Sequence, residues 1–182
     1  MQGADTGNGT VSIAAEANAT EGSRTAQLSF SSFGTVRSAT VTQRGQKRTW
    51  NEWKEDEITS RDPDTDQTGP NDSPAGDGIP NLLKYATGLD PLKPCGSVVQ
   101  VTAEEAGGDA CLVLGWPVNP EATGIRHAVE ASEDLQTWTE TAEVKTEGKS
   151  SATFRDAVPM NAESPRRRFL RLKISREGES PL

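Results

Sequence analysis

The sequence predicts a mainly β fold in which one short helical element joins two β-rich regions. A chain of 182 residues with 17 glycines, 11 prolines and 32% hydrophobic residues favours many short strands and turns over long helices. Short segments in which apolar and polar residues alternate, as in half-buried strands, occur before and after the helical element. We therefore expect a β-rich region over residues 1–46, a helix–loop–helix joint over 47–94, a β-sandwich over 95–178 and a tail over 179–182.

The distribution of charge argues against nucleic acid as a partner. The formal net charge of -8 lies after residue 46, with -4 over residues 47–94 and -4 over 95–182, so no region offers the basic face that a phosphate backbone requires. No segment approaches the roughly 18 apolar residues of a membrane span, and the first residues lack the basic and apolar regions of a signal peptide. We expect no nucleic acid, no membrane span and, if the protein is exported, a signal outside this chain.

The first region is expected to form three antiparallel strands. Apolar and polar residues alternate over residues 11–15, 26–30 and 38–43, and turn-forming residues separate these segments. Three strands cannot bury both faces of a sandwich by themselves. We therefore expect residues 1–46 to be a partial domain.

The residue pattern of this region resembles a known family. The pattern consists of Gly9-Thr10-Val11-Ser12-Ile13, Asn18 with Arg24-Thr25-Ala26, and the closing Val41-Thr42-Gln43-Arg44-Gly45. It resembles the second half of a BACON domain, an immunoglobulin-like sandwich associated with carbohydrate-active secreted bacterial proteins. The resemblance implies a truncated immunoglobulin-like sheet, contact with glycan or mucin, and parent-protein domains on the N-terminal side of this chain.

Helix signals are strongest over residues 80–87. Pro80 suits a first helical turn, Gly88 can cap the helix in the left-handed conformation, and Pro91 prevents its continuation. The apolar residues at helical spacing are Ile79, Leu82, Leu83 and Ala86. These signals predict one short amphipathic helix that joins the two β-rich regions.

A second amphipathic helix is expected over residues 49–59, where apolar residues recur at roughly helical spacing. Two tryptophans, Trp50 and Trp53, lie on one face of this helix and need an apolar neighbour because each can bury a large area. The obvious neighbour is the helix at 80–87. We expect the tryptophan face to pack against Leu82, Leu83 and Ala86, which would make the joint stiff.

The loop between these helices carries alternating aspartates, the pattern of a calcium loop in which several oxygens converge on one hard cation. When residues 66–76 are set aside as an insertion, loop positions 1, 3, 5, 7 and 9 are occupied by Asp62, Asp64, Asp77, the carbonyl of Ile79 and Asn81. Position 12, normally a bidentate glutamate, is Lys84. The run from Asp77 to Leu92 resembles the calcium-loop-and-helix element, akin to thrombospondin type 3 and dockerin loops, of large exported bacterial proteins.

Lys84 leaves two interpretations of this loop open. In the first, calcium binds through Asp62, Asp64, Asp77 and Asn81. In the second, the loop is solvated or is neutralised by the ammonium group of Lys84. We favour the second, because a positive charge in place of a bidentate carboxylate lowers the affinity for calcium. We expect the ammonium to approach Asp62, Asp64 or Asp77, and we expect no other cofactor.

The third region is expected to form a β-sandwich of six or seven strands. Its short apolar or alternating segments cover residues 98–102, 111–116, 125–131, 142–144, 152–155 and 169–174. The segment from Val129 to Trp138, followed by Phe154-Arg155-Asp156 and by Arg168 to Leu172, resembles the small β-sandwich that follows the helix element in the same exported proteins. This resemblance implies an architecture and no particular chemistry.

Cys95 and Cys111 are the only cysteines. They stand just after the helix and on the second strand of the β-domain, so we expect a disulfide that pins the linker to the sheet in an oxidising compartment. Two free thiols are the alternative.

The sequence favours a non-catalytic function. It contains no metalloprotease, phosphate-loop or nucleophile-elbow motif, and its only histidine, His127, is expected to be packed or hydrogen-bonded on an alternating strand. We expect a spacer or adhesive region of a secreted or cell-surface bacterial protein. The alternative is a carbohydrate-binding accessory module that stacks sugar on Trp116 and Trp138. Such a module requires the rings of Trp116, Trp138 and Tyr85 to be exposed.

Overall fold

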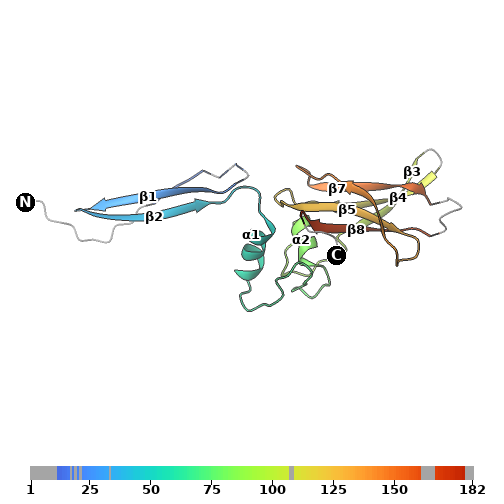
Figure 1. The fold of residues 1–182 in the computed structure, drawn as a ribbon, viewed down its shortest axis with the longest axis horizontal. Helices are drawn as coiled ribbons and strands as arrows, with labels where there is room; N and C mark the ends of the chain where they lie inside the picture. The colour runs from blue at the N-terminus through green and yellow to red at the C-terminus, as the bar shows by residue number, and fades with distance from the viewer. Residues whose placement is uncertain are drawn as a thin grey trace, which may run out of the picture. The chain divides into compact units, whose positions relative to one another are not determined.

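The computed structural model is mainly β, as the sequence predicts, with antiparallel sheets and short helices (Figure 1). The chain divides into two compact units, Met1–Gln46 and Lys47–Leu182. The structure describes residues 12–178, apart from 17, 19, 21, 33, 107–108 and 161–166. The tail expected over 179–182 and the start of the BACON-like pattern, Gly9 to Val11, lie outside the described residues.

The first unit contains an antiparallel two-stranded ribbon of β1 (Arg24–Ser32) and β2 (Thr35–Gln43). The register runs from Arg24 opposite Gln43 to Ser32 opposite Thr35. Gly34 has a φ of 80°, the left-handed conformation that a tight turn between two strands requires. Local turn chemistry therefore fixes this ribbon.

The strand expected over residues 11–15 is not formed in the described part of this segment, because residues 12–16 lie outside any strand. The carbonyl of Glu16 accepts hydrogen bonds from the side chains of Arg24 at 2.7 Å and Gln43 at 2.6 Å. Side-chain donors thus take the place of the N–H donors that a neighbouring strand would supply.

One face of the ribbon is apolar and exposed. Because side chains alternate along a strand, this face is shared by Ala26, Leu28, Phe30, Ala39 and Val41, with Arg37 opposite Phe30. Phe30 is 39% exposed and Val41 is 41% exposed. A two-stranded ribbon supplies no second layer that could cover such a face.

The second unit begins with a helix, α1 (Trp50–Lys54), that continues into a π-helical turn, η1 (Glu55–Thr59). A capping box starts α1, because the hydroxyl of Thr49 accepts from the N–H of Glu52 and the Glu52 carboxylate accepts from the N–H of Thr49 at 2.8 Å. The helix expected over residues 49–59 is confirmed.

The second helix, α2, spans Asn81–Thr87. Pro80 precedes it as the N-cap, with the extended angles φ −61° and ψ 144°, so the helix begins one residue later than expected. Gly88 ends it with a φ of 75°, as its sequence position predicts. The helix expected over residues 80–87 is therefore confirmed apart from its first residue.

The helices of the second unit share one hydrophobic cluster, which consists of Trp50, Trp53, Ile58, Leu82 and Tyr85. The centroid of the Tyr85 ring lies 5.7 and 5.4 Å from those of the two tryptophans. The expected contact of the tryptophans with α2 is confirmed for Leu82. Leu83 and Ala86 lie outside this cluster, and Tyr85 takes their place because it stands three residues after Leu82 on the same helical face.

The rest of the second unit forms two three-stranded antiparallel sheets. In the first sheet the order is β3 (Gln100–Ala106), β4 (Asp109–Pro117) and β7 (Ser151–Pro159). In the second sheet the order is β6 (Thr139–Val144), β5 (Ile125–Ser132) and β8 (Phe169–Arg176). Six or seven strands were expected in this region, and the described residues form six, each overlapping one of the six expected segments.

The two sheets pack face to face around one core. Its buried residues come from both sheets and from the segment after β4, and they are Leu114, Trp116, Val118, Val129 and Ala152. Val129 on β5 lies opposite Leu172 on β8, which packs against the same core. The described residues therefore have the sandwich-like architecture that the sequence predicts.

Hydrogen bonds around Tyr85 attach the helical joint to the sandwich. The Tyr85 hydroxyl contacts the carbonyl of Arg48, lies 3.0 Å from the carbonyl of Thr123 and accepts from the N–H of Thr123 at 2.9 Å. Asn119, which follows β4, donates from its side chain to the carbonyl of Tyr85 and from its N–H to that of Ala86, both at 2.9 Å. The joint and the sandwich therefore belong to one compact unit.

We expect Tyr85→Phe to lower the free energy of unfolding of the second unit by roughly 0.5 to 1.5 kcal/mol, the worth of one ordinary hydrogen bond. The variant keeps the buried ring and removes the hydroxyl. The N–H of Thr123 keeps a second acceptor, the carbonyl of Arg48 at 3.1 Å, which limits the loss. Urea unfolding followed by tryptophan fluorescence measures the change, with Ser38→Ala on β2 as the control. A midpoint equal to that of the wild type would contradict this role of the hydroxyl.

Candidate functional site

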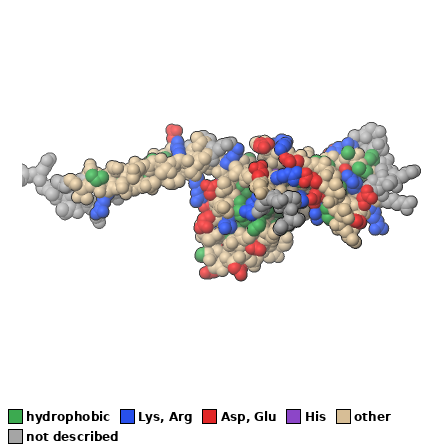
Figure 2. All heavy atoms as spheres, viewed as in Figure 1, with side chains coloured by type: hydrophobic (Ala, Val, Ile, Leu, Met, Phe, Trp, Pro, Cys, Tyr) green, Lys and Arg blue, Asp and Glu red, His purple; other side chains and the backbone are tan. Residues whose placement is uncertain are grey.

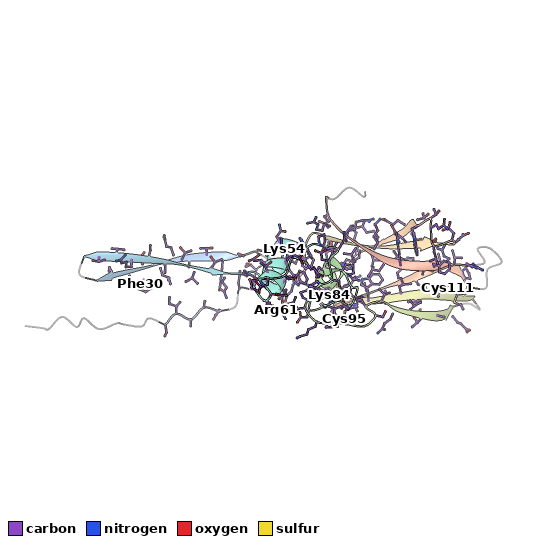
Figure 3. The ribbon with its side chains drawn as sticks, turned by 90° about the horizontal axis from the view of Figure 1, so that it is seen from below. Phe30, Lys54, Arg61, Lys84, Cys95 and Cys111 are labelled. Atoms are coloured by element: carbon purple, nitrogen blue, oxygen red, sulfur yellow. The ribbon has the colours of Figure 1, made fainter. Side chains whose placement is uncertain are left out.

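A buried polar centre surrounds Lys84 on α2 (Figure 3). The Lys84 side chain is fully buried, and its ammonium nitrogen lies 2.8 Å from Oδ2 of Asp77, whose side chain is 6% exposed. The ammonium also donates to the carbonyl of Lys93 at 3.0 Å and to that of Pro91 at 3.3 Å. Each of its three N–H groups therefore has an oxygen acceptor within reach.

The local sequence explains how these acceptors reach the ammonium. Gly88 ends α2 in the left-handed conformation, and the N–H of Leu89 donates to the carbonyl of Lys84 at 2.9 Å, so the chain reverses at the end of the helix. The side chain of Asp90 accepts from the N–H of Leu92 at 3.0 Å and holds the next turn. The two carbonyls supplied by this turn are thereby fixed beside the ammonium group.

Asp77 accepts hydrogen bonds from three further O–H and N–H donors, and the thiol sulfur of Cys95 lies 3.5 Å from its Oδ2. Its Oδ1 accepts from the hydroxyl of Ser73 and the N–H of Ile79, and its Oδ2 accepts from the N–H of Cys95, all at 2.9 Å. The hydrogen bond from Lys84, followed by those from the main chain, holds the pKa of Asp77 well below its usual range. The carboxylate is therefore ionised. It links the segment before α2, through Ser73 and Ile79, and the segment after α2, through Cys95, to Lys84 on the helix.

The expected approach of the Lys84 ammonium to a loop aspartate is confirmed for Asp77. The calcium ligand set predicted from the sequence, Asp62, Asp64, Asp77 and Asn81, is not assembled. Among the described residues, no three His, Cys, Asp or Glu side chains form a group that could hold a metal ion. The physical reason is that donors already surround the Asp77 carboxylate.

Asn81 also has a different role from the one predicted. Its side-chain amide donates to the carbonyls of Gln67 at 3.1 Å and Gly69 at 3.0 Å. Its own N–H donates to the carbonyl of Asp72 at 2.8 Å. Asn81 therefore ties the inserted segment 66–76 to the start of α2, and this segment is part of the folded loop.

The predicted disulfide is wrong, because Cys95 and Cys111 are both free. Figure 3 shows Cys95 close to Lys84 and Cys111 at the distant end of the sandwich. Cys111 lies near the start of β4, and the pairing of β3 with β4 carries this residue away from the linker. Burial, and then the carboxylate of Asp77 near the sulfur, raise the pKa of the Cys95 thiol.

Trp116 is not a sugar contact, and this prediction is wrong. The side chain is 3% exposed, and its indole N–H donates to Nδ1 of His127 at 3.1 Å inside the sandwich. Trp138 is half-buried, and the guanidinium carbon of Arg171 lies 4.1 Å from the centre of its ring. Tyr85, the third ring considered, is fully buried. Sugar contact by Trp138 alone stays a prediction.

The structure confirms that His127 is packed and hydrogen-bonded. Its ring is nearly coplanar with that of Trp116, with centroids 6.3 Å apart and an angle of 12° between the planes. Because Nδ1 accepts the indole N–H, the hydrogen-bond network assigns the proton of the neutral ring to Nε2. Burial lowers the pKa of His127 to about 4, so the ring is neutral at pH 7.

Ion pairs between neighbouring strands were not predicted from the sequence. Buried Glu130 on β5 accepts from Arg171 at 2.8 Å and from Lys173 at 2.7 Å, both on β8. Arg126 on β5 pairs with Glu143 on β6 at 2.9 Å. On the face seen in Figure 2, acidic and basic side chains lie next to one another over the second unit. Only the strand register, with Glu130 opposite Arg171, could have revealed these pairs.

Comparisons of the chain with protein-family models, with curated proteins and with solved structures found no match. Among the described residues, no helix has the length and apolar character needed to cross a membrane.

We expect Lys84→Met to lower the melting temperature of the second unit by several degrees or more. Methionine fills a similar volume, but it leaves the ionised carboxylate of Asp77 without its cation in a buried place. Circular dichroism and differential scanning calorimetry measure the shift. The double variant Lys84→Met/Asp77→Asn removes the unpaired charge and should recover part of the loss. If the double variant loses as much stability as Lys84→Met and Asp77→Asn lose in sum, the two side chains are not directly coupled.

We expect the stability of the second unit to fall as the pH decreases from about 6.5 to about 4. Above this window, His127 is neutral in both the folded and the unfolded states. Within it, the unfolded state binds a proton that the folded state does not, so stability decreases by up to roughly 3 kcal/mol. The measurement is the difference in urea unfolding between wild type and His127→Gln, whose amide oxygen can still accept the indole N–H. If the difference in stability between wild type and His127→Gln stays constant from pH 6.5 to 4, the lowered pKa of His127 is contradicted.

Proposed function

We propose that the chain is a non-catalytic spacer or adhesive region of an exported or cell-surface protein, and that its second unit acts as one stiff body. The observation that carries this proposal is the attachment of α2 to the sandwich through Tyr85 and Asn119. A flexible tether between domains has few buried contacts and opens independently of its neighbours. The joint has buried contacts on both sides of α2.

The placement of the large aromatic side chains also supports a structural role. The buried rings are those of Trp50, Trp53, Tyr85 and Trp116. Each such ring removes roughly 150 to 250 Å² from water and so stabilises the folded unit. A carbohydrate-binding module instead presents aromatic rings to its ligand. The burial of these four rings favours the spacer over the alternative function.

The resemblance of residues 77–92 to the loop-and-helix element of exported bacterial proteins supports a secreted or cell-surface location. In that setting a stiff unit holds neighbouring parts of a long protein at a fixed separation. Ion pairs such as that of Arg126 with Glu143 fit a charged surface that faces water.

Single-molecule force spectroscopy on the full chain tests this function. We expect the second unit to unfold in one step, because the joint and the sandwich share buried contacts. Separate steps for the joint and the sandwich would contradict the stiff body. A glycan array on the same chain tests the alternative, with Trp138→Ala as the matched control. Glycan binding that disappears in this variant would favour the carbohydrate-binding function instead.

We expect the amide hydrogens of α2 to exchange with solvent much more slowly than those of β1 and β2. The helix is held by buried side chains on both sides, whereas the ribbon is largely exposed. Hydrogen–deuterium exchange followed by mass spectrometry measures both segments in one experiment. Equal exchange in α2 and in the ribbon would mean that the joint opens freely and does not act as a stiff element.

A further inference from the structure

We infer that the oxygen atoms around Lys84 form a cation-binding site that the chain fills with its own ammonium group. The site consists of Oδ2 of Asp77 and the carbonyls of Pro91 and Lys93, at 2.8, 3.3 and 3.0 Å from the ammonium nitrogen. We call these three oxygens the Lys84 cage. The inference goes beyond the spacer function and does not depend on it.

The Lys84 cage has the composition of a site for a hard cation. One carboxylate oxygen and two main-chain carbonyl oxygens are ligands that such cations prefer, and together they carry the single negative charge that one ammonium balances. The carbonyls are held by the turn after α2, so they keep their positions whatever fills the site. An ordinary surface ion pair has no such fixed carbonyls.

The surroundings of the cage also favour a cation over neutral groups. The Lys84 side chain is fully buried, so no solvent screens the Asp77 carboxylate from the group that fills the cage. Oδ1 of Asn81, three residues before Lys84 on α2, is a buried acceptor without a hydrogen-bond donor in the described residues. A positive charge is the group that stabilises the buried Asp77 carboxylate in these surroundings.

The sequence position of Lys84 agrees with this reading of the geometry. Lys84 stands where the closing carboxylate of a calcium loop would stand, and Asp77 occupies an earlier ligand position of the same pattern. An ammonium in this place supplies the positive charge that a metal would otherwise bring. The loop is then held together whether or not calcium is present, and a chelator should leave the melting temperature of the wild type unchanged.

The first experiment removes the internal cation and replaces it from solution. Lys84→Ala deletes three methylene groups and the ammonium, and n-propylammonium carries the same atoms. We expect n-propylammonium to raise the melting temperature of this variant by a few degrees, increasing with concentration, as a ligand that binds only the folded state does. It should have no such effect on the wild type. If the variant is unfolded alone, its recovery of circular dichroism with n-propylammonium is the readout.

Two controls separate a cation site from an apolar hole. Propan-1-ol has nearly the same shape as n-propylammonium and no charge, and we expect it to give no rescue. The double variant Lys84→Ala/Asp77→Asn lacks the carboxylate, and we expect n-propylammonium to give no rescue there. Equal rescue by the alcohol and the ammonium, or no rescue of Lys84→Ala by either compound, would overturn the inference.

A second variant tests the same site with a divalent cation. Lys84→Glu places a second carboxylate beside Asp77, and the two carboxylates with the fixed carbonyls then require a cation of higher charge. We expect calcium to raise the melting temperature of Lys84→Glu and to leave wild type and the neutral control Lys84→Gln unchanged. A calcium response of the same size in all three proteins would show that calcium binds elsewhere and would overturn the assignment of the cage.

Discussion

The ion pair between Lys84 and Asp77 is the interaction on which the helical part of the second unit depends. A buried ammonium and a buried carboxylate both lose their hydration, and this cost is offset only when hydrogen bonds satisfy the rest of each group. Here main-chain N–H groups and a hydroxyl satisfy the carboxylate, and two main-chain carbonyls satisfy the ammonium. One pair therefore fixes three segments: the end of the acidic loop, α2 and the linker that leads to β3.

The residue after Lys84 extends this constraint to the sandwich. Tyr85 points its ring into the cluster with the two tryptophans and its hydroxyl towards Thr123, so α2 is held on two sides by adjacent residues. A helix of seven residues would not persist in water by itself, because helix nucleation costs more than so few hydrogen bonds return. Its stability thus comes from tertiary contacts. The same contacts make the helix a rigid connection between the acidic loop and the β-strands.

The parts of the fold that could be predicted are those in which a residue determines the conformation of its own stretch of backbone. Pro80 and Gly88 set the ends of α2 through their dihedral angles, and the spacing of Lys84 from Asp77 follows from the loop and the helix between them. Two of the errors concern β4. Alternation along this strand shows that Trp116 and Cys111 lie on definite faces, but only the pairing of β4 with β3 and β7 decides which face is buried and which end of the sandwich each residue reaches. The third strand predicted for the first unit was wrong for a similar reason. The side chains of Arg24 and Gln43 donate to the carbonyl of Glu16, which a third strand would otherwise use.

The buried polar centres at Lys84 and His127 offset the free-energy cost of burial in opposite ways. At Lys84 the charges are kept and matched to each other, so Asp77 stays ionised in mild acid and the joint keeps its ion pair. At His127 the charge is removed, so the ring is buried as a neutral acceptor for the indole N–H of Trp116 and resists protonation until the pH is low. The matched pair specifies one geometry because each donor has one acceptor, whereas the neutral ring tolerates its apolar surroundings without a counter-charge. Below about pH 6.5 the linkage at His127 lowers the stability of the whole second unit, whereas the Lys84–Asp77 pair keeps both of its charges.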